Sequence, residues 1–229
     1  MIIIPQNADV MRTTDYIRGE WNHPGQLQTF DILKNKSIKH VVDIGANVGI
    51  FTDLCFQHFS PIRVDCIEPH PDNIATLKLN FDSRKEVVLH QCAVYYGITE
   101  STSRNPIDEP VNTGGYILSS VPPEHLGRFA DKLYEHPNLI FSVSTLEAQL
   151  AEIPDVIKMD IEGSEYNVIE NSTILKEARF LIIEFHNHTE DYLRIFLQKH
   201  LPMFTIRIIS NESYGGDGQF YYTLLEKTC

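Results

Sequence analysis

The stretch VVDIGANVGIFTDLCFQ, residues 41–57, contains the pattern that decides the fold class. It begins with two valines and an acid, turns through Gly45, Ala46 and Asn47, and enters an apolar, helix-compatible run after Gly49. A short β-branched run followed by a glycine-containing turn and a helix is typical of the first unit of a parallel α/β sheet. The backbone of such a turn can approach a ligand closely, so we expect a nucleotide-binding site here.

Strand-like and helix-like runs alternate on both sides of this turn. Runs rich in β-branched residues predict strands over 40–45, 62–69 and 86–94, and helices are expected around 50–58 and over 71–81. Two successive strand–helix units predict a parallel sheet with right-handed crossovers.

The second half of the chain continues the alternation and adds a different ending. Its expected elements are a strand over 155–163, a helix from about 164 to 171, a strand over 179–188, a helix near 190–200 and strands over 204–210 and 219–227. The last two strands flank the turn-rich sequence NESYGGDG, so we expect them to pair antiparallel.

Two regions fall outside this alternation. Residues 95–137 are rich in proline, glycine, serine and asparagine, and they are too long for an ordinary loop. We expect this insert to shape the pocket for a substrate. The first 40 residues carry no readable motif, and we expect them to cover the site. At 229 residues, the whole chain is expected to form a single domain.

Composition and charge exclude several classes of protein. The chain has 19 Lys and Arg against 31 Asp and Glu, and its formal net charge of −12 would repel a phosphate backbone. A nucleic-acid partner is therefore not expected. The N-terminal run MIIIP is too short for a signal peptide, and no run approaches the roughly 20 apolar residues that span a bilayer, so we expect a cytoplasmic protein without a membrane segment. The cysteines, Cys55, Cys66, Cys92 and Cys229, form no CxxC pair and indicate neither zinc nor disulfides.

The residues around the turn indicate which nucleotide would bind. The dinucleotide fingerprint G-x-G-x-x-G has a middle glycine that the sequence GANVG lacks. Asp43 precedes the turn, and its carboxylate would repel a pyrophosphate but would suit the positively charged amino-acid moiety of S-adenosylmethionine. Glu68, after the second strand, can accept hydrogen bonds from both ribose hydroxyls, although NAD sites use an acid in the same way.

Several motifs together resemble the FkbM family of S-adenosylmethionine-dependent O-methyltransferases. The motifs lie between about residues 40 and 188 and read VVDIGANVGIFT, IEPHPDNIATLKLN, NTGGYIL, STLEAQL, VIKMDIEGSEYNVI and IIEFH. The resemblance implies a Rossmann-like class I methyltransferase fold, with a seven-stranded, mostly parallel sheet, a reversed C-terminal strand and helices on both faces. It also implies S-adenosylmethionine as the methyl donor and a hydroxyl group of a small-molecule or carbohydrate acceptor.

The turn and the fold together suggest a first group of candidate residues, at the cofactor. These are Asp43, Gly45, Ala46, Asn47, Gly49, Glu68, Cys92 and Ala93. Cys92 and Ala93, at the end of the third expected strand, would lie beside the adenine by analogy with the fold, and core packing is an equal alternative. Asp43 could instead cap the turn by bonding backbone amides.

Charged residues in two otherwise apolar strands form the second group. Side chains alternate along a strand, so Lys158 and Asp160 share one face, as do Glu184 and His186 on the next strand. Buried charges are costly unless they are paired, so the first two form either a structural ion pair or part of a catalytic site. We expect Asp160 to act as a general base or to orient the acceptor, with His186 as the second choice and Lys158 beside them.

A metal ion is an alternative at the same place. Asp160, Glu162 and Glu184 could hold a divalent cation that lowers the pKa of the acceptor hydroxyl. Glu162 could equally begin the next helix, where the helix dipole favours an acid. The site without a metal ion is our main expectation.

Three other functions stay open. RNA ribose 2'-O-methylation is disfavoured by the net charge of −12. A catalytically silent S-adenosylmethionine-binding partner subunit is disfavoured by the intact acidic residues, and an NAD-dependent oxidoreductase by the missing middle glycine. The identity of the acceptor and the oligomeric state have no readable signal in the sequence.

Overall fold

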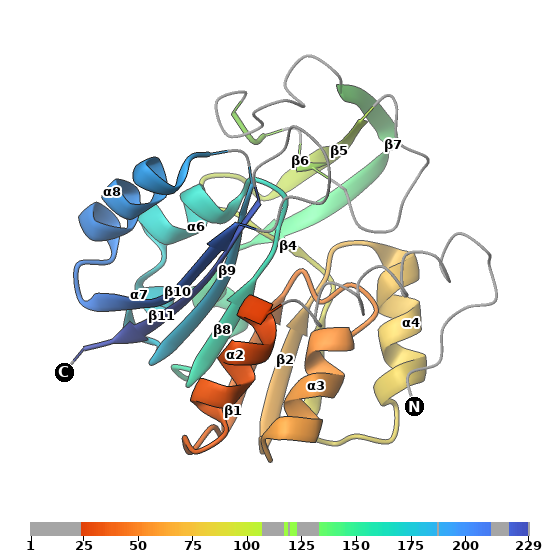
Figure 1. The fold of residues 1–229 in the computed structure, drawn as a ribbon. Coiled ribbons are helices and arrows are strands. Elements are labelled where there is room, and N and C mark those ends of the chain that lie inside the picture. Colours follow the sequence, from red (N-terminus) through yellow and green to blue (C-terminus); the bar gives the residue numbers. More distant parts are fainter. Residues whose placement is uncertain are drawn as a thin grey trace.

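A seven-stranded sheet runs through the middle of the molecule (Figure 1). The computed structural model describes residues 24–106, 117–118, 120–122, 133–186, 188–211 and 220–228. The strands of the large sheet are β1 (His40–Ile44), β2 (Arg63–Ile67), β3 (Val87–His90), β8 (Val156–Met159), β9 (Phe180–His186), β10 (Phe204–Asn211) and β11 (Phe220–Lys227). Their order across the sheet is β10-β11-β9-β8-β1-β2-β3.

All but one of these strands run in the same direction. Strand β1 pairs in parallel with β2 and β8, and the β2–β3 and β8–β9 pairs are parallel as well. Strand β11 is antiparallel to both of its neighbours, β9 and β10, so it alone is reversed. The predicted mostly parallel sheet with a reversed C-terminal strand is therefore confirmed.

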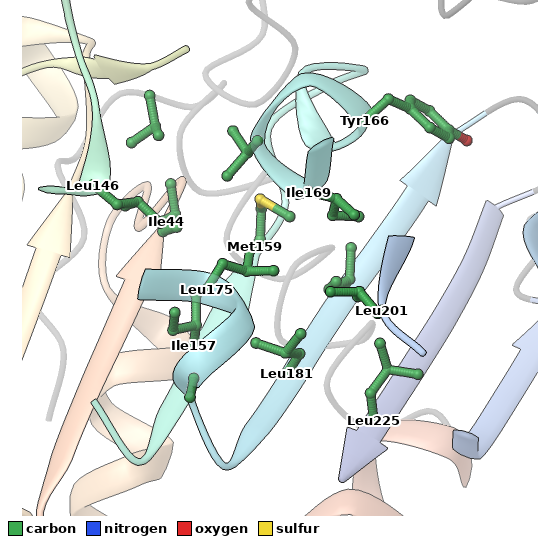
Figure 2. Close-up of a cluster of buried hydrophobic side chains, with 14 of the residues drawn as sticks. Ile44, Leu146, Ile157, Met159, Tyr166, Ile169, Leu175, Leu181, Leu201 and Leu225 are labelled. Atoms are coloured by element: carbon green, nitrogen blue, oxygen red, sulfur yellow. The ribbon is translucent and has the colours of Figure 1, made fainter. Parts of the chain in front are cut away.

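Helices cover both faces of the sheet (Figure 1). One face packs against α2 (Pro24–Leu33), α3 (Ile50–His58) and α4 (Pro71–Phe81), and the other against α5 (Leu146–Gln149), α6 (Glu165–Asn171), α7 (Thr173–Glu177) and α8 (Glu190–His200). Figure 2 shows the second core, in which Ile157 and Leu181 of the sheet lie among leucine and isoleucine side chains. Among the helices of the described ranges, none is long and apolar enough to cross a membrane.

Helix α4 shows how local sequence produces one of these elements. His70 caps its first turn by accepting a hydrogen bond at 3.3 Å from the backbone nitrogen of Asp72, and Pro71 occupies the first position, where no backbone donor is needed. Ile74, Leu77 and Phe81 recur at helical spacing and are all buried. The helix begins three residues after Glu68, so its capped end borders the carboxyl edge of the sheet.

A second, smaller sheet extends over the insert and its flanks, and this pairing was not predicted. Its strands are β4 (Ala93–Val94), β5 (Glu100–Pro106), β6 (Ile117–Leu118) and β7 (Leu133–Ser144), in the order β4-β7-β5-β6. Figure 1 shows this sheet beyond the carboxyl ends of the large sheet. The expectation of an irregular segment was wrong for the described part of 95–137, because the polar sequence of β5 carries no apolar alternation and gains its order by pairing with β7.

The same pairing divides the third predicted strand. The expected strand over 86–94 ends at His90, and Ala93 and Val94 leave the large sheet to pair in parallel with Val143 and Ser144 of β7. A continuous apolar run does not reveal which partner strand each of its halves will meet.

Helix α2 lies within residues 1–40, which were expected to cover the site. It packs against the large sheet, with Phe30 and Leu33 buried in the first core. The Tyr222 hydroxyl of β11 donates a hydrogen bond to Thr29 Oγ1 at 2.8 Å. The rest of the expected cover, residues 1–23, lies outside the described residues.

Candidate active site

The turn after β1 is held in place by atoms of the chain itself. Gly45 and Gly49 have φ values of 72° and 92°, and Asn47 between them has a φ of 50°. A Cβ atom added to Gly45 would lie 1.9 Å from the carbonyl oxygen of Asp160, and one added to Gly49 would lie 2.3 Å from Phe81 Cε2. Both positions therefore require glycine, for the left-handed backbone and for close packing against β8 and α4.

Asp43, in β1, forms a contact with α3 and lies close to Lys158 of β8. It is fully buried, and its Oδ2 accepts a hydrogen bond from Thr52 Oγ1 of α3 at 2.7 Å. Its Oδ1 has no hydrogen-bonding partner in the described part of the chain, although Lys158 Nζ lies 3.5 Å away. Burial raises the pKa of Asp43, and the positive charge of Lys158 opposes that rise.

Glu68 follows β2 and accepts hydrogen bonds from two loops. Its Oε2 accepts from the backbone nitrogen of Asn47 at 2.9 Å, and its Oε1 accepts from the backbone nitrogen of His70 at 2.9 Å and from Asn73 Nδ2 at 3.2 Å. Burial raises the pKa of Glu68, and these hydrogen bonds oppose the rise. The Glu68 carboxylate thus joins the glycine turn to the start of α4.

The polar atoms at this edge fit a cofactor that carries hydrogen-bond donors. Asp43 Oδ1 and Asn47 Oδ1 are buried acceptors without a hydrogen-bonding partner among the described residues. The carboxylate of Glu68 has further lone pairs that can accept hydroxyl donors. An ammonium group and ribose hydroxyls, both present in S-adenosylmethionine, are donors of this kind.

The remaining cofactor candidates lie in the core. Ala46 is 4% exposed and belongs to the first core. Cys92 and Ala93 are each 6% exposed and follow the end of β3, so neither belongs to the strand on which it was expected. Burial raises the pKa of the Cys92 thiol to about 11, as for a packed, unreactive side chain.

Lys158 links the turn to the acids at the end of β8. Its Nζ donates a hydrogen bond to the carbonyl oxygen of Gly45 at 2.9 Å and lies 3.5 Å from Asp43 and 3.8 Å from Asp160. Burial lowers the pKa of Lys158, but Asp43, Asp160 and Glu184 outweigh burial and raise it. The shared face predicted for Lys158 and Asp160 is confirmed, and the contacts of the ammonium group are those of a positioning residue.

His186, at the end of β9, is surrounded by acids. Its Nε2 lies 3.9 Å from Asp160 Oδ1, 3.6 Å from Glu162 Oε2 and 3.7 Å from Glu184 Oε1, and its Nδ1 lies 3.4 Å from Glu165 Oε1. Burial lowers the pKa of His186, but Glu162, Glu165 and Glu184 outweigh burial and raise the pKa well above its usual value. The ring therefore holds its proton near neutral pH and is poorly suited to act as a base.

Asp160 is more accessible to solvent than His186. Its side chain is 33% exposed, against 4% for His186. Its backbone touches the turn at Gly45, so Asp160 adjoins the residues that fit a cofactor. An acceptor molecule could therefore reach its carboxylate.

Glu165 was missed by the sequence reasoning. It is fully buried at the start of α6, and its Oε1 accepts a hydrogen bond from the backbone nitrogen of Ile161 at 2.9 Å. Its Oε2 has no hydrogen-bonding partner within the described ranges. The stretch DIEGSEY contains this acid three residues after Glu162, but only the tertiary structure brings it to His186.

Comparisons with known proteins identify the family of the chain. The family description "Methyltransferase FkbM domain" matches residues 43–206. Over 146 residues the chain is 27% identical to the hexuronic acid methyltransferase AglP of Haloferax volcanii, an alignment that covers 63% of this chain and 54% of that protein. The chain thus spans about half the length of this relative.

Two solved structures are similar in fold. The methyltransferase FkbM of Methylobacillus flagellatus KT gives a TM-score of 0.51 at 22% identity, over 82% of this chain and 43% of that one. An rRNA methylase of Streptococcus thermophilus gives 0.53 at 11% identity, over 91% of this chain and 99% of that one. At these identities both comparisons support the fold alone.

Proposed function

Because the chain belongs to the FkbM methyltransferase family, we propose that it transfers a methyl group from S-adenosylmethionine to a hydroxyl group of a carbohydrate or other small molecule. The observation that carries this proposal is the contact between the glycine turn and Asp160. Gly45 packs against the Asp160 backbone, so a cofactor on the turn and an acceptor at the Asp160 carboxylate would be neighbours. Holding two reactants in contact is a large part of what a methyltransferase must do.

The cofactor would be held by the acceptors around the turn. Asp43 Oδ1 and Asn47 Oδ1 would accept hydrogen bonds from its amino-acid part, and Glu68 would accept them from its ribose hydroxyls. Bound S-adenosylmethionine supplies an electrophilic methyl group on a positively charged sulfur. The surrounding acids Asp43 and Glu68 favour that positive charge electrostatically.

Asp160 would receive the proton of the acceptor hydroxyl. A positioned carboxylate of this kind contributes roughly 10² to 10⁴ to the rate. His186 keeps its own proton because of the acids around it. We therefore assign it the role of orienting Asp160 and not that of removing the proton. Lys158 would hold the turn against β8 while the reaction proceeds.

A carbohydrate acceptor is favoured over RNA. The matching relative acts on a hexuronic acid, and the net charge of −12 together with the acids around His186 would repel a phosphate backbone. The similarity to an rRNA methylase is a similarity of fold and gives no information about the substrate. The accessible Asp160 carboxylate argues against a catalytically silent subunit.

Calorimetry with S-adenosylhomocysteine and NAD tests the cofactor assignment. We expect S-adenosylhomocysteine to bind and, at about 100 times its Kd, to raise the free energy of unfolding by roughly 2.7 kcal/mol. Glu68→Gln should weaken binding by about 1 to 3 kcal/mol, since it removes a charged acceptor. The exposed Glu152→Gln is the matched control and should bind as the wild type does. Heat from NAD and none from either S-adenosyl compound would contradict the proposal.

A further inference from the structure

We propose that Asp160, Glu162 and His186 form a binding site for a divalent cation at the carboxyl edge of the sheet. Asp160 and Glu162 follow β8, and His186 ends the neighbouring strand β9. One carboxylate oxygen of each acid and one ring nitrogen of His186 all lie within 4.8 Å of one another. The three side chains thus converge from two adjacent strands on one point.

The distances from His186 to the two acids fall within the range expected for ligands around an ion. Ligands about 2.1 Å from an octahedral cation lie about 3 Å apart when adjacent and about 4.2 Å apart when opposite. His186 Nε2 lies 3.9 Å from Asp160 Oδ1 and 3.6 Å from Glu162 Oε2. Glu184 Oε1, at 3.7 Å from the same nitrogen, lies outside this set of three and would reach the ion through water.

A second observation is the state of the histidine itself. The His186 side chain is 4% exposed, and its Nδ1 points toward a different acid, Glu165, whose Oε1 lies 3.4 Å away. Its Nε2 faces the three carboxylates at 3.6 to 3.9 Å. A charge-assisted hydrogen bond would shorten such a contact to about 2.7 to 2.9 Å. The ring is therefore buried and aimed at the acids without forming a hydrogen bond to any of the three.

The backbone conformation of Glu162 also brings its carboxylate to this site. Glu162 has a φ of 54°, in the left-handed region that costs a residue other than glycine roughly 1 to 2 kcal/mol. In this conformation its carboxylate lies 3.6 Å from His186 Nε2. This conformation brings the Glu162 carboxylate to the same ring nitrogen as Asp160 and Glu184.

The donor set indicates the kind of ion. Carboxylates suit magnesium and manganese, and an imidazole nitrogen suits manganese, iron and zinc, so Mn²⁺ fits both types of donor. The ion would offset the mutual repulsion of Asp160, Glu162 and Glu184. It would also make this otherwise acidic corner attractive to an acceptor with negatively charged or hydroxyl oxygens.

The role of the ion rests on the proposed function. An acceptor hydroxyl bound beside the ion would have a lowered pKa and would lose its proton to water. Its oxygen would then form the bond to the methyl carbon as the carbon–sulfur bond breaks and leaves its electron pair on sulfur. With the ion bound, Asp160 would be a ligand rather than the proton acceptor, and His186 would release a ring proton to bind the ion through Nε2.

Binding of Mn²⁺ to the full chain, followed by the electron paramagnetic resonance signal of the free ion, tests the site. After treatment with EDTA and its removal, we expect the wild type to bind one Mn²⁺ per chain. His186→Ala and Glu162→Gln should each weaken binding by at least 10-fold. Glu162 is 26% exposed, so Glu162→Gln should fold even if His186→Ala does not. The matched control Glu190→Gln, in the exposed first turn of α8, should bind as the wild type does.

The outcomes separate this proposal from the function on which its role depends. Absence of Mn²⁺ binding overturns the ion site, and so does unchanged binding in both site variants. Methyl transfer that survives EDTA overturns the catalytic role of the ion and leaves the proposed function standing. Tight Mn²⁺ binding together with no binding of S-adenosylhomocysteine supports the ion site while the proposed function fails.

Discussion

Two clusters in this molecule combine histidine with carboxylate, and they differ in how closely their members approach. At Asp65 of β2, His40 Nε2 lies 2.7 Å from Oδ2, His90 Nε2 lies 2.7 Å from Oδ1, and Arg63 Nε donates to Oδ2 at 2.6 Å. Around His186, the nearest carboxylate oxygens lie at 3.4 to 3.9 Å. The first cluster is closed by hydrogen bonds, and the second is open.

The difference lies in the ratio of donors to acceptors. Asp65 is one buried acceptor among three donors, so each of its oxygens is bonded and the pKa of its carboxyl is far below the usual range. His186 is one ring among four acids, which cannot all approach it at once. A closed cluster stabilises the fold, whereas an open cluster leaves capacity for a ligand. Substitutions in the two clusters should therefore affect different properties.

The largest expected effect is that of Asp160→Asn on catalysis. This change keeps the shape of the side chain but removes its charge, so kcat should fall by about 10² to 10⁴ while the Kd for S-adenosylhomocysteine stays nearly constant. Steady-state kinetics and calorimetry measure the two quantities. Asp191→Asn, on the exposed side of α8, serves as the control.

A structural role for Asp160 would give a different result. In that case Asp160→Asn would unfold the protein, and the double change of Lys158→Met with Asp160→Leu would restore stability. Replacing both members of a buried ion pair can be neutral where removing one is not.

A smaller effect is expected from Asp65→Asn, and it should appear in stability. Removing this charge leaves His90 and the largely buried His40 without their ionised partner and should lower the free energy of unfolding by about 2 to 4 kcal/mol. Urea denaturation measures the change. The activity per folded molecule should be retained, and unchanged stability would show that the closed cluster contributes little.

The smallest effect is a loss of stability at alkaline pH. The hydrogen bond to Asp65 holds the pKa of His90 above its usual value despite partial burial. A raised folded-state pKa stabilises the fold below the unfolded value of about 6.5, and this contribution is lost as the pH rises through the folded-state pKa. The melting temperature of the wild type should therefore fall more between pH 6 and pH 9, roughly the range above the reference pKa, than that of Asp65→Asn. Parallel curves would exclude His90 as a source of the pH dependence.

Local pattern was sufficient for most of the large sheet and for the residues that the structure brings together at its carboxyl edge. The run from Val41 to Gln57 predicted β1, its turn and α3 because β-branched residues, glycine and helical spacing each act over a few neighbouring residues. The strand pattern likewise placed Asp160 and His186 at the ends of neighbouring strands, and the structure brings them to 3.9 Å. The reversed strand followed from the turn-rich sequence before β11.

Tertiary structure alone decided the remainder. The polar β5 is a strand because β7 pairs with it. Helix α2 is held at the core by a hydrogen bond from Tyr222 of β11 to Thr29, two residues that lie 193 positions apart in the sequence. Sequence presents Asp65 and Asp160 in the same way, as acids in or directly after buried strands. Only folding surrounds the first with donors at 2.7 Å and leaves the second 3.9 Å from its histidine. That separation depends on how distant strands pack, and no pattern of neighbouring residues encodes it.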